Sequence, residues 1–461
     1  MERPTPATRR LLGSLGVAVL LGLATAAVAW WRLGPVTRGT VWAEDGGLFL
    51  RERIALGPID SLLHPYAGYL HLLPRLLVDV GWALPVSDYA LVLSGGACLV
   101  VGVLGAAVYL LARDVVPIAP VRALLAVSPA LLPLAPHEIS GNAANLHWFV
   151  LAAAPWVFAY RARTWWASGA VALLAVFLVL TELQTVAFLP LLLLAWLPLR
   201  DPSGARAWPR ALPVTVVTVA GGLAQVVTAL TTERTARPGA PAVSDVAAGW
   251  LLQPFAGIWD PDVGAVVRAV LAQGWTVVVA PAVLVLLVVA AAVVVGSWRA
   301  RAMTVALGLA SLGTWWAALI ANGGAARGWA HPVEALAAVG PLRYAAASGL
   351  LLLAAVLVAA GVLVGSSRWA SAVRRRTRPG GAVRLTGAAT GWCVVALVVV
   401  VAVAGVVPGP TRRSDGPVWA EQIPGAVASC AGDPARSADV RTAPWGADVP
   451  CTRLLPAGGG R

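Results

Sequence analysis

The sequence predicts an all-α polytopic membrane protein with about eleven transmembrane helices of roughly 20 residues each. Three observations support this prediction: 59% of the 461 residues are hydrophobic, only 12% are charged, and the mean hydropathy is +0.79. A water-soluble core could not accommodate so apolar a chain, so its main solvent must be lipid.

The first apolar run, from Leu11 to Trp31, directly follows Arg9 and Arg10. It could be a cleaved signal peptide, but its length is that of a full span. Trp30 and Trp31 stand where interfacial aromatic residues belong, so we expect a retained anchor. The other runs lie at residues 88–112, 119–136, 146–160, 167–181, 184–199, 211–231, 275–297, 302–321, 344–365 and 387–407.

Positive charge is carried by 34 arginines, and the net charge is +13. Nucleic-acid binding is not expected, because no basic patch alternates with stacking aromatic residues in a polar segment. The arginines cluster in every second connection, the pattern of cytoplasmic loops in a multi-pass cell-membrane protein with a cytoplasmic amino terminus. These connections contain Arg113, Arg122, Arg161, Arg163, Arg200, Arg206, Arg210, Arg299, Arg301 and a cluster between Ser366 and Thr386.

The longest polar segments lie on the opposite, extracytoplasmic face. Stretches rich in Trp, Tyr and Leu, Tyr66 to Val80 and Trp250 to Trp259, predict helices that lie in the membrane interface. The chain thus divides into a transmembrane domain, residues 1–407, and an extracytoplasmic tail, residues 408–461. The outer loops cover residues 32–87, 232–274 and 322–343.

The four cysteines fall into two groups. Cys98 and Cys393 lie inside apolar runs, where a small apolar side chain is sufficient explanation. Cys430 and Cys451 lie in the tail, on the oxidising side of the membrane. We therefore expect a disulfide that closes the tail.

The segment Val41 to Leu50, VWAEDGGLFL, is the first candidate for chemistry. Its adjacent carboxylates, Glu44 and Asp45, lie beside two glycines at the membrane surface. Ionisable groups near hydrocarbon are costly to desolvate, so their presence indicates a function. A solvated turn is the alternative, because Asp-Gly is a frequent turn pair.

Further along the same loop, the segment HPYAGYLHLLPR interleaves polar and aromatic residues with leucines. A helix starting at Tyr69 would place His71 and Arg75 on one face. These side chains could contact a substrate, or they could belong to an interfacial helix and reach lipid headgroups. The candidates are His64, Tyr66, Tyr69, His71 and Arg75.

A second cluster, PHEISGNAANLHW, begins at the outer end of the third apolar run. Asparagine offers hydrogen-bond donors and acceptors to a hydroxyl-rich ligand, and tryptophan offers an apolar face to a sugar ring. Alternatively, the Asn and Gly residues only cap helices. The candidates are His137, Glu138, Asn142, Asn145, His147 and Trp148.

Two isolated charges complete the set of candidates. Glu182 lies in or near the membrane with no cation close in sequence, so it needs a distant partner unless it sits in a water-exposed hairpin. Arg343, beside Tyr344, opens the tenth run on the outer side, against the topology bias. The planar guanidinium of Arg343 could donate paired hydrogen bonds to the phosphate of a lipid substrate. Alternatively, it could contact ordinary lipid headgroups.

Several chemistries are disfavoured by missing motifs. The sequence contains no zinc spacing, phosphate-cradling glycine loop or nucleophile elbow, which argues against a nucleotide-driven pump and a serine hydrolase. No cofactor is expected. A divalent metal remains open, because five candidates could meet around one: Glu44, Asp45, His64, His137 and Glu138.

The acidic motif of the first outer loop (Glu44, Asp45), the interfacial helices, the many spans and the late outer Arg-Tyr pair (Arg343, Tyr344) resemble the GT-C superfamily of integral membrane glycosyltransferases. That superfamily includes protein mannosyltransferases, lipid A aminoarabinose transferases and mycobacterial arabinofuranosyl and mannosyl transferases. The resemblance covers residues 1 to about 407 loosely. This chain departs from the common acidic pattern by carrying Glu-Asp instead of Asp-Asp, and it lacks a large carboxy-terminal soluble domain.

The resemblance implies an inverting glycosyltransferase that takes a sugar from polyprenyl phosphate and passes it to a glycan, lipid or protein of the cell envelope on the extracytoplasmic face. Asp45 would be the base, with Glu44 as neighbour or backup. Arg343 would bind the lipid phosphate, with Arg75 as second choice. The sugar or acceptor would be bound by His137, Glu138, Asn142 and Asn145, with His64, Tyr66, Tyr69, Trp148 and Tyr344 as further substrate-binding candidates.

Two other functions remain open. A transporter or flippase of lipid-linked sugars would place charges opposite one another near the bilayer midplane, whereas these charges crowd the outer boundary. A non-catalytic partner in cell-envelope assembly would need the outer loops but no base.

Overall fold

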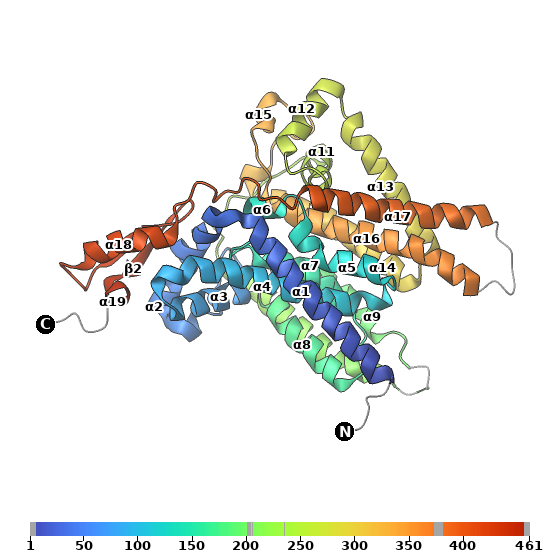
Figure 1. The fold of residues 1–461 in the computed structure, drawn as a ribbon, viewed down its shortest axis with the longest axis horizontal. Helices are drawn as coiled ribbons and strands as arrows, with labels where there is room; N and C mark the ends of the chain where they lie inside the picture. Colours follow the sequence, from blue (N-terminus) through green and yellow to red (C-terminus); the bar gives the residue numbers. More distant parts are fainter. Residues whose placement is uncertain (1–5, 201–203, 205, 235, 373–380, 456–461) are drawn as a thin grey trace.

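The computed structural model describes residues 6–455, except 201–203, 205, 235 and 373–380 (Figure 1). The described chain is mostly helical, with a single two-stranded sheet near its carboxyl end. Arg374, Arg375, Arg376 and Arg378, which belong to the cluster expected in the last cytoplasmic loop, lie outside the described residues.

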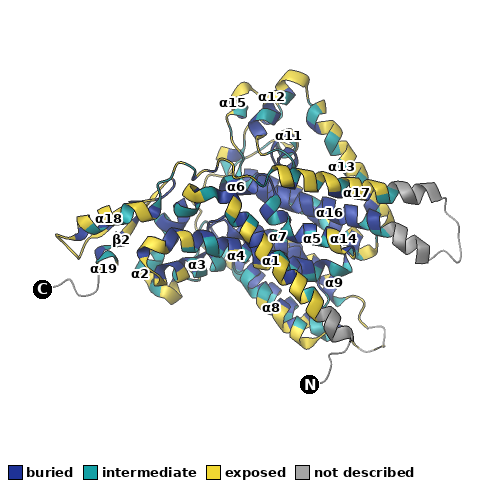
Figure 2. Cartoon of the chain, viewed as in Figure 1, coloured by how far each residue is buried: buried dark blue, intermediate teal, exposed yellow. Residues whose placement is uncertain are grey.

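Seven helices of the described chain are long and apolar enough to cross a membrane, which supports the membrane assignment. Figure 2 shows exposed residues along α1 and α17. Many of the exposed side chains are apolar, including Leu20 in α1 and Val400 in α17. The seven are α1 (Pro6–Gly39), α4 (Tyr89–Leu111), α10 (Leu212–Thr231), α13 (Thr276–Val295), α14 (Trp298–Ala321), α16 (Arg343–Ala372) and α17 (Gly381–Ala404).

The other four predicted spans are shorter helices. Proline interrupts three of these regions, at Pro129, Pro155 and Pro190, where it removes a backbone donor. A helix much shorter than about 17 residues does not reach across the hydrocarbon core, so a count of eleven crossings stays a prediction. The shorter elements are α5 (Ala119–Leu131), α7 (Leu146–Ala159), α8 (Trp165–Val179) and the 3₁₀ segment η4 (Leu183–Leu191) continued by α9 (Leu192–Trp196).

Helix α16 forms the centre of the bundle. It packs against α14, α17, α13 and α5, and its side chains from Leu350 to Leu363 are almost all buried. Arg343 is its first residue, so the central helix begins at the end of the bundle where the long polar loops gather.

The connections rich in arginine contact one another at the other end. Arg163 pairs with Asp114 at 2.7 Å, and Arg161 donates a hydrogen bond to the carbonyl oxygen of Arg200 at 3.2 Å. The predicted grouping of these connections is therefore present in the fold. Which end faces the cytoplasm stays a prediction.

Short helices cover the loop end. The predicted interfacial stretches contain α3 (Leu72–Ala83) and the turns η6 (Leu251–Phe255) and η7 (Ala256–Ile258). Figure 1 shows α2 and α3 together on one side, and α11, α12 and α15 gathered beside the start of α13. The remaining bounds are η1 (Asp45–Leu50), α2 (Arg51–Asp60), η2 (Val86–Asp88), η3 (Ala112–Asp114), α6 (Ala135–Glu138), η5 (Trp208–Ala211), α11 (Val243–Trp250), α12 (Val263–Gln273), η8 (Gly323–Ala325) and α15 (Glu334–Ala337).

The carboxy-terminal segment folds against the first outer loop. It consists of α18 (Trp419–Cys430), the antiparallel strands β1 (Ser437–Arg441) and β2 (Gly446–Pro450), and α19 (Cys451–Leu454). A disulfide joins Cys430 to Cys451, with Cα atoms 5.4 Å apart. Trp419 is fully buried, and its indole N–H donates to the carbonyl oxygen of Val86 at 2.7 Å. The predicted tail and the first outer loop thus share one hydrophobic core.

Candidate functional site

A polar cavity of about 390 Å³ lies at the loop end of the bundle. Its walls come from the first outer loop, the turn before α7, the residues after α8, the end of α14 and the start of α16. Ten of the candidates named from the sequence line it: Glu44, Tyr66, Tyr69, His71, Asn145, His147, Trp148, Glu182, Arg343 and Tyr344.

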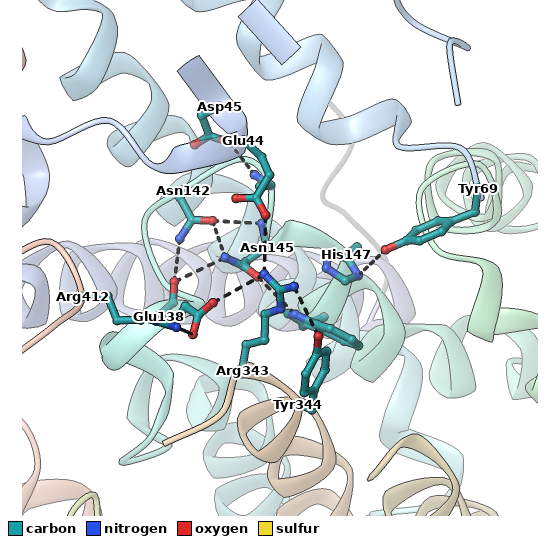
Figure 3. A network of polar contacts seen from close by, with 12 residues as sticks. Glu44, Asp45, Tyr69, Glu138, Asn142, Asn145, His147, Arg343, Tyr344 and Arg412 are labelled. Atoms are coloured by element: carbon teal, nitrogen blue, oxygen red, sulfur yellow. Dashed lines mark hydrogen bonds and ion pairs between the residues drawn. The ribbon is translucent and has the colours of Figure 1, made fainter. Parts of the chain in front are cut away.

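Arg343 is the central charge of this site. Its Nη1 lies 3.5 Å from Oε1 of Glu44 and 3.6 Å from Oε1 of Glu138. Arg412 approaches the second oxygen of Glu138 at 3.1 Å, from the segment before α18. Figure 3 shows the two carboxylates converging on the Arg343 guanidinium, with Tyr344 beside it. Two carboxylates and two guanidiniums balance in formal charge, so neither carboxylate is left without a cationic neighbour.

Asp45 points away from the cavity, contrary to the expectation that it is the primary base. Its carboxylate oxygens accept the backbone N–H groups of Ala143 and Ala144 at 2.9 and 2.7 Å. The side chain is fully buried, and burial raises its pKa to about 7 against the opposing effect of these hydrogen bonds. Asp45 therefore holds the turn before α7 in place, while Glu44 presents its carboxylate to the cavity (Figure 3).

The two glycines after Asp45 are required by the carboxy-terminal segment. A Cβ on Gly46 would lie 2.6 Å from Cγ2 of Thr442, and one on Gly47 would lie 2.9 Å from the carbonyl oxygen of Gly446. Any larger residue would push the segment away. In the motif EDGG, Glu44 therefore lines the cavity and Asp45 is buried against backbone N–H groups. The two glycines allow the carboxy-terminal segment to pack closely.

The asparagines of the second cluster mainly shape their own turn. Asn142 donates to the carbonyl oxygen of Glu138 at 2.7 Å and accepts the backbone N–H of Asn145 at 2.9 Å. Asn145 in turn accepts the indole N–H of Trp148 at 3.2 Å. Asn142 lies behind the cavity wall, whereas Asn145 and Trp148 form part of it. Gly141 makes this tight turn possible, since its φ of +67° disfavours a side chain.

Besides Asp45, Glu138 and Asn142, three predicted residues lie outside the cavity lining. Arg75, the second choice for the lipid phosphate, is buried, pairs with Glu52 at 2.6 Å and lies over the ring of Phe49. His64 is exposed beside the same Glu52 carboxylate. His137 does not reach the cavity, and burial lowers its pKa. Arg75 is therefore already neutralised where a phosphate ligand would need it free.

Aromatic side chains form the wall nearest the first outer loop. Tyr66 and Tyr69 are linked by a reciprocal pair of backbone hydrogen bonds around Ala67 and Gly68, both with positive φ. His71 stacks on Tyr69, with ring centroids 4.0 Å apart, and its Nδ1 lies 3.1 Å from the carbonyl oxygen of Tyr69. Burial holds the pKa of His71 well below its usual value, so this histidine is neutral at physiological pH.

The sequence singled out His147 and Glu182 without pairing them, and it did not single out Arg234. His147 and Glu182 pair at 2.5 Å, which supplies the distant partner that Glu182 needs. Arg234 lines the cavity from the loop after α10, and no described residue pairs with it. The available signal in the sequence was an arginine in a predicted outer loop, against the positive-inside bias.

An apolar groove of about 660 Å³ adjoins the polar cavity. It runs between η4 and α14, and Leu183, Gln184 and Ala317 line both spaces. Its lining is almost entirely apolar, and α14 is long and apolar enough to span a membrane. The two spaces together suit a ligand with a polar head and a long apolar tail.

The proposed meeting of five ligands around a divalent metal does not occur. Glu44 and Glu138 approach each other only through Arg343, and the described residues contain no group of three or more metal-ligating side chains. The site is therefore organised by ion pairs and hydrogen bonds. No protein-family model, curated protein or solved structure matches this chain.

Proposed function

We propose that this protein is a membrane glycosyltransferase that transfers a sugar from a polyprenyl-phosphate donor to a cell-envelope acceptor on the extracytoplasmic face. The observation that carries the proposal is the junction of a charged cavity containing Glu44 and Arg343 with an apolar groove along α14. A lipid-linked sugar has the same two parts in the same order. Both volumes fall within the range of about 300–1,000 Å³ found for small-molecule sites.

Glu44 is the base in this proposal. Its Oε1 faces Arg343 at 3.5 Å, whereas its Oε2 is buried and has no hydrogen-bond partner. An unpartnered buried carboxylate oxygen is costly, and an acceptor hydroxyl would satisfy it. Asp45 cannot do this, because both its oxygens already accept backbone N–H groups. General-base assistance accounts for roughly 10²–10⁴-fold in rate.

Arg234 is the phosphate-binding residue in this proposal. Arg343 already balances two carboxylates and is better placed to orient Glu44. Arg234 lines the same cavity and has no anionic partner among the described residues. Its guanidinium would stabilise the charge that develops on the leaving phosphate.

The aromatic wall provides the sugar-binding surface. The aromatic side chains of Tyr66, Tyr69 and Trp148 line the cavity, and Asn145 adds a polar group. Apolar ring faces and amide groups together recognise the mixed surface of a pyranose or furanose. Displacement of the phosphate by the acceptor hydroxyl on the opposite side of the anomeric carbon would invert its configuration.

The decisive experiment is a transfer assay on the full chain in lipid nanodiscs, with a panel of radiolabelled short-chain polyprenyl-phosphate monosaccharides. We expect Glu44→Gln to lower kcat by roughly 10²–10⁴-fold, because the hydroxyl loses its base. Glu421→Gln, which removes an exposed carboxylate from α18, is the matched control. Full activity in Glu44→Gln would remove this mechanism. Import or flipping of the intact donor without cleavage would favour a transporter instead.

A further inference from the structure

His147 and Glu182 form a buried pair to which the transfer described so far assigns no role. Nδ1 of His147 lies 2.5 Å from Oε2 of Glu182, and Oε1 accepts the backbone N–H of Gln184 at 2.8 Å. Glu182 is 1% exposed, and no other cation lies within 4.0 Å of it among the described residues. The pair is thus a fixed carboxylate whose counter-ion is an imidazole.

The carboxylate sets the orientation of the histidine ring. A carboxylate at Nδ1 makes that nitrogen the hydrogen-bond donor, which leaves Nε2 for another partner. Tyr69 also lies on the Nδ1 side, with its hydroxyl at 3.4 Å (Figure 3). No described residue bonds to Nε2, and His147 lines the cavity. The free nitrogen is therefore available to a ligand.

The carboxylate of Glu182, at 2.5 Å, is the charge in closest contact with the His147 ring, and Coulomb energy rises steeply at short range and low dielectric. Tyr69 and His71 also face the ring, and burial keeps both neutral by raising the pKa of Tyr69 and lowering that of His71. Arg343 and Arg234 are the two guanidiniums that line the same cavity as His147.

The pair lies where the polar cavity meets the apolar groove. Glu182 immediately precedes Leu183 and Gln184, which line both spaces, and Gln184 is hydrogen-bonded to Glu182 itself. The phosphate of an amphiphilic donor would occupy this junction, with its tail in the groove and its sugar in the cavity.

We infer that His147 is a catalytic acid that binds the carrier phosphate through Nε2 and that Glu182 is its positioning residue. This inference rests on the proposed glycosyl transfer. It assigns the acid to one side of the cavity and leaves Glu44 as the base on the other.

The transfer step is balanced in atoms and charge. The acceptor oxygen bonds to the anomeric carbon as its proton passes to Glu44. The bond between that carbon and the bridging phosphate oxygen breaks, and its electron pair stays on the phosphate. The proton on Nε2 of His147 moves to the phosphate, and a proton returned from Glu44 through solvent restores both residues.

Phosphate binding can be tested without knowing the sugar. Farnesyl phosphate and farnesol are titrated onto the full chain in nanodiscs between pH 5.5 and 8.5. We expect His147→Gln to bind farnesyl phosphate about tenfold more weakly at low pH, because a charge-assisted hydrogen bond is lost. For the wild-type chain, the Kd for farnesyl phosphate should fall as the pH falls. In His147→Gln, this Kd should no longer depend on pH in that way. Glu182→Gln, which removes the carboxylate that orients the ring, should also bind farnesyl phosphate more weakly, by less than His147→Gln.

Two controls separate this role from a structural one. Farnesol lacks the phosphate, so its binding should be the same in every folded variant. His71→Gln changes another buried cavity histidine that is neutral, and it should keep the wild-type pH dependence. An unchanged pH profile in His147→Gln, or equal losses for farnesol and farnesyl phosphate, would overturn the inference.

The acid role has its own kinetic test. A donor with sulfur in place of one non-bridging phosphate oxygen leaves as a less basic thiophosphate and needs less protonation. His147→Gln should therefore lose more kcat with the phosphate donor than with the thiophosphate donor, whereas Glu44→Gln should lose equally with both. Equal losses in His147→Gln would contradict the acid role. If no donor is cleaved but phosphate binding still depends on His147, the glycosyl transfer fails and the phosphate site stands.

Discussion

Asp45 accepts the backbone N–H of Ala144 at 2.7 Å, across 99 residues of sequence. This contact, with the equivalent one from Ala143, fastens the first outer loop to the turn that carries Asn145 and His147. Two walls of the cavity are therefore positioned by one buried carboxylate. Asp45 therefore positions the cavity walls relative to each other, although its own side chain does not face the cavity.

Asp45→Asn should destabilise the protein at neutral pH. The amide can accept only one of the two backbone N–H groups, and a buried unsatisfied donor costs about 1–3 kcal/mol. Thermal unfolding in detergent, followed by tryptophan fluorescence, measures this loss. Asp439→Asn, at an exposed position of β1, is the control and should unfold like the wild type.

Asp45 should also make stability depend on pH. Its pKa is raised from 3.8 to about 7 in the folded protein, so the folded state retains a proton that the unfolded state releases. The stabilisation is fully present below about pH 4 and is lost as the pH rises to about 7. The unfolding temperature should fall over this window, and the fall should be smaller in Asp45→Asn. An equal slope in both proteins would contradict the assignment.

Arg413→Gln should release the carboxy-terminal segment. Arg413 is buried and donates to the carbonyl oxygens of Thr40, Ser140 and Gly141, at 3.1, 2.7 and 2.9 Å. Removing a buried charge with several hydrogen bonds costs about 3 kcal/mol or more. Limited proteolysis between α17 and α18 should become faster. Arg436→Gln, at an exposed site of the same segment, should leave the rate unchanged.

Loss of the disulfide should loosen the same segment. Cys430 and Cys451 are 21 positions apart, and closing a loop of this size stabilises a fold by roughly 3 kcal/mol. A double Cys→Ser variant should unfold at lower temperature. It should also lose donor binding, because the first outer loop shares a core with this segment. Cys393→Ser changes an exposed free cysteine and serves as the control. Unaltered stability in the double variant would contradict this role.

Arg234→Gln should weaken the binding of a lipid phosphate specifically. Its guanidinium lines the cavity without a partner among the described residues, so removing it leaves no buried anion uncompensated. The Kd for farnesyl phosphate should rise about tenfold, since a charge-assisted hydrogen bond is lost. The Kd for farnesol should not change. Arg327→Gln, in another outer loop, is the matched control.

Ala310→Phe should narrow the apolar groove. Ala310 lines it from α14, and the added ring would occupy space that a polyprenyl chain needs. Long-chain donors should lose more activity than farnesyl donors, measured as kcat/KM for each chain length. Leu286→Phe, on the exposed face of α13, should not discriminate between them. Equal losses for all chain lengths would place the lipid elsewhere.

The sequence alone was sufficient for the membrane assignment, because hydrophobic run length is a local property. The long apolar runs became α1, α4, α10, α13, α14, α16 and α17, and the structure contains the disulfide expected between Cys430 and Cys451. The four shorter regions show the limit of this reasoning. Hydropathy does not reveal how proline and 3₁₀ segments shorten a helix.

The sequence could not predict which candidate residue has which role in the site. Glu44 and Asp45 are adjacent and chemically alike, yet one faces the cavity and the other is buried against backbone N–H groups 98 and 99 residues away. Likewise, Arg75 is neutralised by Glu52, whereas Arg234 pairs with no residue that the structure describes. Glu182 found its partner in His147, 35 residues earlier. The sequence determined which residues carry charge near the membrane, because composition and periodicity are local. Only the tertiary structure decided which of them meet, because ion pairing, burial and orientation depend on contacts between distant segments.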